Sequence, residues 1–193
     1  MSALISDKSI LEPNWAEWRL QRFSNMPASV QSWLRDEGSL TRRVVEACGE
    51  GRFRVRLLHQ GWGTPLYSEG RVLRLRRGEA TLIREVELLC DECPWVFART
   101  LIPATSLKGS ARRLTQLGEK PLGAVLFSDP KINRGITQMA RLQPRHPLFA
   151  AATAHLERQP KELWGRRTLF HIAKRPLLVN EIFLPDIPNR ENP

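Results

Sequence analysis

Alternation of apolar and polar residues at every second position constrains this fold more than any other feature of the sequence. A β-strand points successive side chains to opposite faces, so this alternation is typical of a strand with one buried face. In residues 52–60, Phe53, Val55 and Leu57 alternate with three arginines, which predicts one wet face. The other segments interpreted as strands are 81–90, 95–103, 167–173 and 177–184.

The links between these segments predict antiparallel pairing. Residues 91–94 form a short turn between two of them, and residues 174–176 form another. One helix is expected to begin at Pro27. A second is expected over 107–118, followed by a short turn over 121–126. Strands joined by hairpins, with helices set apart, predict an α+β fold on an antiparallel sheet.

The length and composition predict a single domain spanning residues 1–193. Hydrophobic residues make up 41% of the chain, enough for one core. We find no bilayer-spanning apolar run and no secretory signal, and three cysteines are too few for a disulfide framework; a cytoplasmic protein without membrane insertion is therefore expected. The ends, about 1–20 and 186–193, are expected to be loosely ordered, and 133–164 is interpreted as an extended excursion or lid.

The formal net charge of +10 allows three kinds of partner: nucleic acid, an acidic membrane surface or an anionic small molecule. The basic residues are dispersed rather than clustered, as in the alternating arginines of 52–56 and the pair Arg166–Arg167. Dispersed charges are typical of solvated faces, so most of these residues are interpreted as surface and no nucleic-acid binding is expected.

Two charged residues interrupt apolar files of the predicted strands. Arg84 shares a face with Leu82, Val86 and Leu88, whereas the opposite face of that strand is the more polar one. Glu181 shares a face with apolar residues in the last strand. Burying a lone charge costs several kcal/mol, so each of the two needs a partner.

Two interpretations of this pair remain open. Arg84 and Glu181 can pair with each other as a structural ion pair, or both can face a cavity whose anionic ligand completes the charge balance. Arginine suits a carboxylate because its planar fork makes two parallel hydrogen bonds. A glutamate desolvated among apolar neighbours would be a proton donor near neutral pH.

Five segments of the chain resemble the chorismate lyase family, in the order expected for it. They are GSLTRRV (38–44), LIREVELLCDECPWVFART (82–100), LTQLGEKPLGAVLF (114–127), LWGRRTLFHI (163–172) and RPLLVNEIFLP (175–185). The resemblance implies a monomeric domain with a six-stranded antiparallel sheet, and an internal ligand site between that sheet and two helical flaps.

The resemblance also implies the residues of the site. The family's carboxylate-binding arginine falls on Arg84, its acidic residue near the ring hydroxyl on Glu181, and a flap leucine on Leu122. A fourth contact, often methionine in the family, falls on Leu40, a conservative departure that matters only if its side chain touches the ring. No cofactor and no metal are implied.

The activity implied is removal of pyruvate from chorismate to give 4-hydroxybenzoate, the first step of ubiquinone biosynthesis, with product inhibition. One alternative is a non-catalytic domain of the same fold that senses a small aromatic carboxylate. Such a sensor is expected to carry a helix-turn-helix domain, for which the residues before Trp33 are too few. A basic nucleic-acid-binding module is the other alternative, and it expects clustered basic residues with stacking aromatics.

The cysteines and histidines give weaker signals. Cys90 and Cys93 form a C-x-x-C, but no second pair completes a zinc site, so a structural turn is expected. The four histidines have no serine or cysteine partner in a recognisable motif. His171 is expected to have a packing or surface role, although it could line the site. Trp62 and Trp95 could shape the pocket, but nothing in the sequence assigns them to it.

Overall fold

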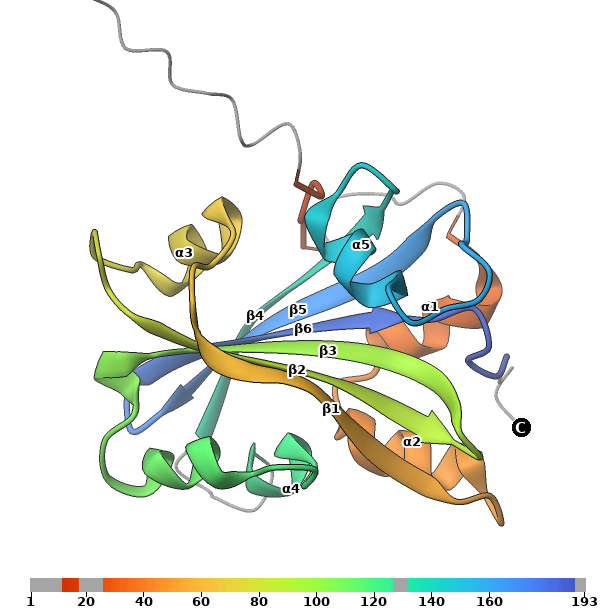
Figure 1. Cartoon of the computed structure of the whole chain (residues 1–193), viewed down its shortest axis with the longest axis horizontal. Helices are drawn as coiled ribbons and strands as arrows, with labels where there is room; N and C mark the ends of the chain where they lie inside the picture. The colour runs from red at the N-terminus through yellow and green to blue at the C-terminus, as the bar shows by residue number, and fades with distance from the viewer. Residues whose placement is uncertain (1–11, 18–25, 127–131, 190–193) are drawn as a thin grey trace, which may run out of the picture.

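A six-stranded antiparallel sheet in the order β1-β2-β3-β6-β5-β4 forms the centre of the computed structural model, which describes residues 12–17, 26–126 and 132–189 (Figure 1). The strands are β1 (Phe53–Gly63), β2 (Thr81–Cys90), β3 (Cys93–Pro103), β4 (Ile132–Leu142), β5 (Leu163–Ile172) and β6 (Arg175–Phe183). The predicted α+β class, single domain and six-stranded antiparallel sheet are confirmed.

Helices cover both faces of the sheet. The helices are α1 (Ala28–Arg35), α2 (Leu40–Cys48), α3 (Tyr67–Leu73), α4 (Leu122–Leu126) and α5 (Pro147–Thr153), with 3-10 turns η2 (Ala104–Ser106) and η3 (Gly109–Gln116). Apolar residues of α1, α2, η3 and α4 pack on one face, whereas those of α3 and α5 pack on the other. Figure 1 shows α2 and α4 on the same side of the twisted sheet.

Both predicted hairpins are present, and each turns within two residues. The β2–β3 turn is Asp91–Glu92, with φ of 48° and 67°, and the β5–β6 turn is Ala173–Lys174, with φ of 49° and 67°. Two consecutive left-handed residues match the twist of antiparallel strands. The helix predicted over 107–118 is a 3-10 helix over most of that range.

The interpretation of 133–164 as an excursion or lid is wrong at both ends, because its first part is a strand and Leu163 and Trp164 begin β5. Residues Ile132–Leu142 form the edge strand β4, which pairs with β5 along its length except at a bulge between Arg134 and Thr137. Its alternation is weak because the exposed Gly135 and Ile136 lie in this bulge. A period-of-two pattern is lost wherever a bulge adds a residue to one strand.

The more polar face of β2, opposite Arg84, is buried as well. Nearly every residue of β2 is buried, and Ile83 on this second face belongs to the same core cluster as Leu73 of α3. Glu87 pairs there with Arg56, and Glu85 pairs with Arg99 at 2.5 Å. Charged residues of this second face are therefore enclosed as ion pairs rather than exposed to water.

Parts of the predicted loose ends are packed where the structure describes them. Ala16 exchanges two backbone hydrogen bonds with Met139, at 3.0 and 2.8 Å, and Ile187 is buried. The rest of those ends lies outside the described residues. No helix among the described ranges is long and apolar enough to span a membrane.

Cys48 and Cys90 form a disulfide, which the sequence interpretation had not expected. The bridge joins the last residue of α2 to the last residue of β2, with a Cα–Cα distance of 5.7 Å. Cys93, the other member of the C-x-x-C, is a free thiol. The turn is structural, as predicted, but one of its cysteines also anchors a helix of the larger layer.

Candidate functional site

The candidate site lies where Arg84 and Glu181 project from one face of the central strands. Arg84 pairs in register with Thr100 of β3, which pairs with Val179 of β6. Glu181 lies two residues beyond Val179 and therefore shares its face. Alternation predicts both charges in apolar files, and the strand register confirms that they belong to one surface of the sheet.

A cavity between this surface and the helical layer contains both charges. Its empty volume is about 610 Å³, part of it open to solvent. Its floor consists of sheet residues, and its roof comes from the α1–α2 loop, α2 and α4. All four predicted site residues line it, namely Leu40, Arg84, Leu122 and Glu181.

Arg84 is held from outside the cavity. Its side chain is almost completely buried, with 2% of the residue exposed. Its Nη2 donates to the backbone carbonyls of Gly118 at 2.8 Å and Lys120 at 3.0 Å, which lie in the segment before α4. Its Nε has no hydrogen-bond partner among the described residues, and burial lowers the pKa of the guanidinium.

Glu181 pairs with a different arginine. Its Oε2 accepts a hydrogen bond from Arg166 Nε at 2.5 Å. The hypothesis of a structural ion pair between Arg84 and Glu181 is therefore wrong. The expected lone, desolvated carboxyl group is also wrong, because a fixed guanidinium compensates the charge of Glu181.

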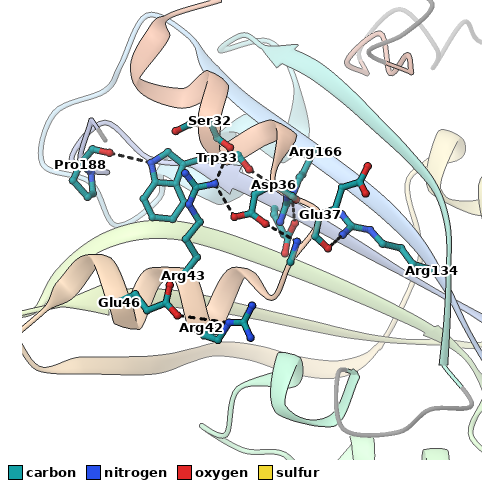
Figure 2. A network of polar contacts seen from close by, with 12 residues as sticks. Ser32, Trp33, Asp36, Glu37, Arg42, Arg43, Glu46, Arg134, Arg166 and Pro188 are labelled. Atoms are coloured by element: carbon teal, nitrogen blue, oxygen red, sulfur yellow. Dashed lines mark hydrogen bonds and ion pairs between the residues drawn. The ribbon is translucent and has the colours of Figure 1, made fainter. Parts of the chain in front are cut away.

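Arg166 connects this carboxylate to the roof of the cavity. It is 1% exposed and donates through Nη1 to the carbonyls of Trp33, at 3.1 Å, and Asp36 (Figure 2). These carbonyls lie at the end of α1, where backbone acceptors lack helical donors. The interpretation of Arg166–Arg167 as a solvated pair is wrong, since both residues are buried.

The two helical flaps expected from the resemblance are α2 with its preceding loop, and α4. Ser39 caps α2 by accepting from the backbone N–H of Arg42, which fixes Leu40 in the first turn over the cavity. The flaps touch at Gly123, where an added Cβ would lie 2.9 Å from Thr41 Oγ1 and 3.2 Å from Ser39 Oγ. An added methyl group would therefore force the side chains of Thr41 and Ser39 to move.

Residues that the sequence analysis missed also line the cavity. They are chiefly Thr41, Thr100, Arg134, Arg166 and Thr168. The alternation of β5 does carry a signal, because Arg166 shares a file with Trp164 and Phe170. Arg134 gives no such signal, since it adjoins the bulge of β4.

Charges in the cavity wall favour an anionic ligand. Arg84, Arg134 and Arg166 line the cavity with one acid, Glu181, which leaves two net positive charges. Burial and the neighbouring charge of Arg166 lower the pKa of Arg134. A dianion of small size would offset these buried charges.

Other residues considered from the sequence lie elsewhere. His171 follows Phe170 in β5 and so points to the opposite face of the sheet. Trp62 is largely exposed, and neither Trp62 nor Trp95 lines the cavity. Within 12–17, 26–126 and 132–189, no group of three or more histidine, cysteine or acidic side chains is arranged to hold a metal ion.

The fold and the cavity define a class of protein: a single α+β domain with a cavity, lined by three arginines and one glutamate, between an antiparallel sheet and a helical layer. Among solved structures, PhnF from Mycobacterium smegmatis is similar in fold, with a TM-score of 0.60 and 17% identity over 80% of this chain and 67% of that chain.

The sequence profile of chorismate lyase matches residues 12–192. A probable chorismate pyruvate-lyase of Methylococcus capsulatus is 44% identical over 158 residues, covering 82% of this chain and 96% of the relative. A second one, of Nitrosomonas europaea, is 41% identical over 161 residues, covering 83% and 89%. The chain belongs to the chorismate lyase family, and this membership supports lyase activity on chorismate.

Proposed function

We propose that this protein converts chorismate to 4-hydroxybenzoate and pyruvate, and that this supplies the aromatic ring of ubiquinone. The observation that carries the proposal is the cavity wall: Arg84 and Glu181 face the same enclosed space without pairing with each other. The distribution of charge fits a flat ring with a carboxylate at one end and a hydroxyl at the other.

Arg84 binds the ring carboxylate in this proposal. Its Nη2 is fixed by the carbonyls of Gly118 and Lys120, whereas its Nε has no partner among the described residues. A guanidinium held in this way offers its remaining donors in a fixed plane, as a carboxylate requires. A bound carboxylate also offsets the cost of burying the arginine.

Glu181 receives the hydrogen bond of the hydroxyl on ring carbon 4. Its pairing with Arg166 favours this acceptor role over the proton-donor role expected from the sequence. In the reaction the bond between ring carbon 3 and the ether oxygen breaks, and carbon 4 loses its proton. Enolpyruvate leaves with the bonding pair and takes up a proton at its methylene carbon, giving pyruvate and an aromatic ring.

The apolar roof excludes water and restrains the ring. Leu40 and Leu122 come from the two flaps and line the cavity together with the apolar Val86 and Val179. Closing such a site strengthens the electrostatic interactions within it. We propose that flap opening limits product release and causes product inhibition. We further propose that the protein acts as a cytoplasmic monomer without cofactor, metal or nucleic acid.

The test is to incubate the purified protein with chorismate and measure 4-hydroxybenzoate and pyruvate. Arg84→Ala and Glu181→Gln are each expected to lower kcat/KM roughly a hundred-fold or more, as for other positioned polar groups. Glu162→Gln, an exposed partner of Arg141, is the matched control and should keep full activity. An inactive wild type that still binds 4-hydroxybenzoate would instead indicate a sensor of aromatic carboxylates.

A further inference from the structure

We propose that Arg134 is a specificity-determining residue that binds the second carboxylate of the substrate, the one on the enolpyruvyl group. This inference rests on the proposed function, because it assigns the part of chorismate that the product no longer carries. Arg134 would then allow one cavity to bind the dianionic substrate more tightly than the monoanionic product.

The position of Arg134 follows from the edge of the sheet. It pairs in register with Phe170, directly before the bulge that ends at Thr137. From there its side chain lines the cavity and reaches the α1–α2 loop, where Nη1 donates to the carbonyl of Glu37 (Figure 2). Arg134 therefore closes the β4 side of the cavity, whereas Arg84 enters from β2 near the other sheet edge.

The other two arginines of the cavity are assigned to other acceptors: Arg166 to protein groups, and Arg84, in the proposed function, to the ring carboxylate. Arg166 uses Nε for Glu181 and Nη1 for two backbone carbonyls. Arg84 is oriented by the segment before α4, on the opposite side of the sheet centre. Arg134 has one backbone acceptor and no ion pair with a carboxylate in the described part of the chain. It is the cavity arginine best placed to receive a further anion.

The charges around Arg134 favour binding of an anion next to its guanidinium. Burial and the charge of Arg166 both disfavour its protonated form, and the acids that oppose them are Glu181, Glu37 and Asp36. Glu181 pairs with Arg166, and Asp36 pairs with Arg43 at 2.8 Å. Glu37 is exposed, and the three acids together offset these effects only in part, since the pKa of Arg134 is still lowered. A ligand carboxylate would supply the remaining compensating charge.

The consequence is differential binding of substrate and product. Chorismate carries a ring carboxylate and an enolpyruvyl carboxylate, but 4-hydroxybenzoate keeps only the first. An interaction with Arg134 strengthens binding of the substrate and disappears once pyruvate leaves. Binding energy that acts on the substrate alone raises kcat/KM without tightening the product.

The experiment compares chorismate turnover with 4-hydroxybenzoate affinity in Arg134→Gln and Arg134→Lys. Loss of a charge-assisted contact is expected to lower kcat/KM for chorismate roughly ten- to hundred-fold in Arg134→Gln. The dissociation constant for 4-hydroxybenzoate, measured by calorimetry, should change less than about three-fold. Arg134→Lys keeps the charge and should recover part of the loss.

Arg141→Gln is the matched control, because Arg141 lies on the same strand but forms an exposed pair with Glu162. It should leave both measurements unchanged. If Arg134 serves only to tether the loop at Glu37, its replacement should weaken chorismate and 4-hydroxybenzoate equally, and this would overturn the inference. Unchanged kcat/KM in Arg134→Gln would overturn it too, whereas an inactive wild type would refute the proposed function itself.

Discussion

Arg166 lies on β5, next to the edge strand β4, with its side chain buried, and it donates to three acceptors at once. Nε holds Glu181, and Nη1 holds the carbonyls that end α1. The ring of Phe183 lies 6.0 Å from its guanidinium carbon. A single residue therefore fixes both the acid of the candidate site and the loop that begins the first flap.

Replacing Arg166 tests this arrangement. Arg166→Met should lower the free energy of unfolding by about 3–5 kcal/mol, because it leaves the Glu181 carboxylate without its compensating charge. The double variant Arg166→Met/Glu181→Gln removes that carboxylate charge and should be the more stable of the two. The free energy of unfolding of both variants is measured by urea denaturation.

Arg141→Met provides the comparison, because its exposed ion pair should contribute less than about 1 kcal/mol. Equal stability of the single and double variants would show that the Arg166–Glu181 pair carries no net electrostatic stabilisation.

At the scale of elements, α4 approaches α2 and its preceding residue closely at one side of the cavity. Gly123 permits this contact because its missing Cβ leaves room for Thr41 and Ser39. The sheet on the other side of the cavity is continuous and fully paired in its centre. We therefore expect the proposed opening of the site to involve α2 and α4 rather than the strands.

Gly123→Ala should weaken retention of 4-hydroxybenzoate. The added methyl group would separate the flaps at a cost of about 1–3 kcal/mol, as for other overpacked contacts. The rate of product dissociation, measured by stopped-flow displacement, should rise accordingly. Thr41→Ala in the same chain removes the nearest atom, Oγ1, and should restore part of the retention.

Gly70→Ala is the control for this experiment, because a Cβ there meets only Leu75 Cδ1 at an ordinary 3.8 Å. A dissociation rate in Gly123→Ala equal to that of the wild type would contradict the assignment of these flaps as the gate.

Five of the six strands could be predicted from the sequence, and the sixth could not. Alternation is a local property, so the predicted segments match β1, β2, β3 and β6 closely. The segment predicted at 167–173 covers only part of β5, because it misses the first four residues, Arg166 among them. In β4 the bulge at Gly135 and Ile136 shifts the pattern, and scattered polar residues hide the buried end at Met139 and Ala140. The sixth strand was expected only because the family resemblance implied it.

At the scale of the whole molecule, the Cys48–Cys90 disulfide joins the helical layer to the sheet. It closes a loop with a sequence separation of 42 residues and ties α2 to β2, which carries Arg84. The sequence analysis expected no disulfide, because three cysteines gave no pattern of pairs. Only the fold brings the ends of α2 and β2 together.

Reduction of this bridge should destabilise the protein. Chain entropy alone predicts a loss of about 4 kcal/mol for a loop of this size. Thermal unfolding with and without dithiothreitol measures the effect, and Cys48→Ala/Cys90→Ala should show no response to the reductant. Cys93→Ala should respond like the wild type, because Cys93 is not bridged. Identical melting of the wild type under both conditions would contradict a stabilising bridge.

The sequence by itself determined that Arg84 and Glu181 belong to the buried face, because side-chain direction in a strand follows from position along the chain. It also determined the two hairpins, since their turns are short. The tertiary structure decided that Arg166 rather than Arg84 pairs with Glu181, and that Arg134 joins the same cavity. These outcomes depend on the strand order β3-β6-β5-β4 and its register, which are long-range pairings that no local pattern encodes.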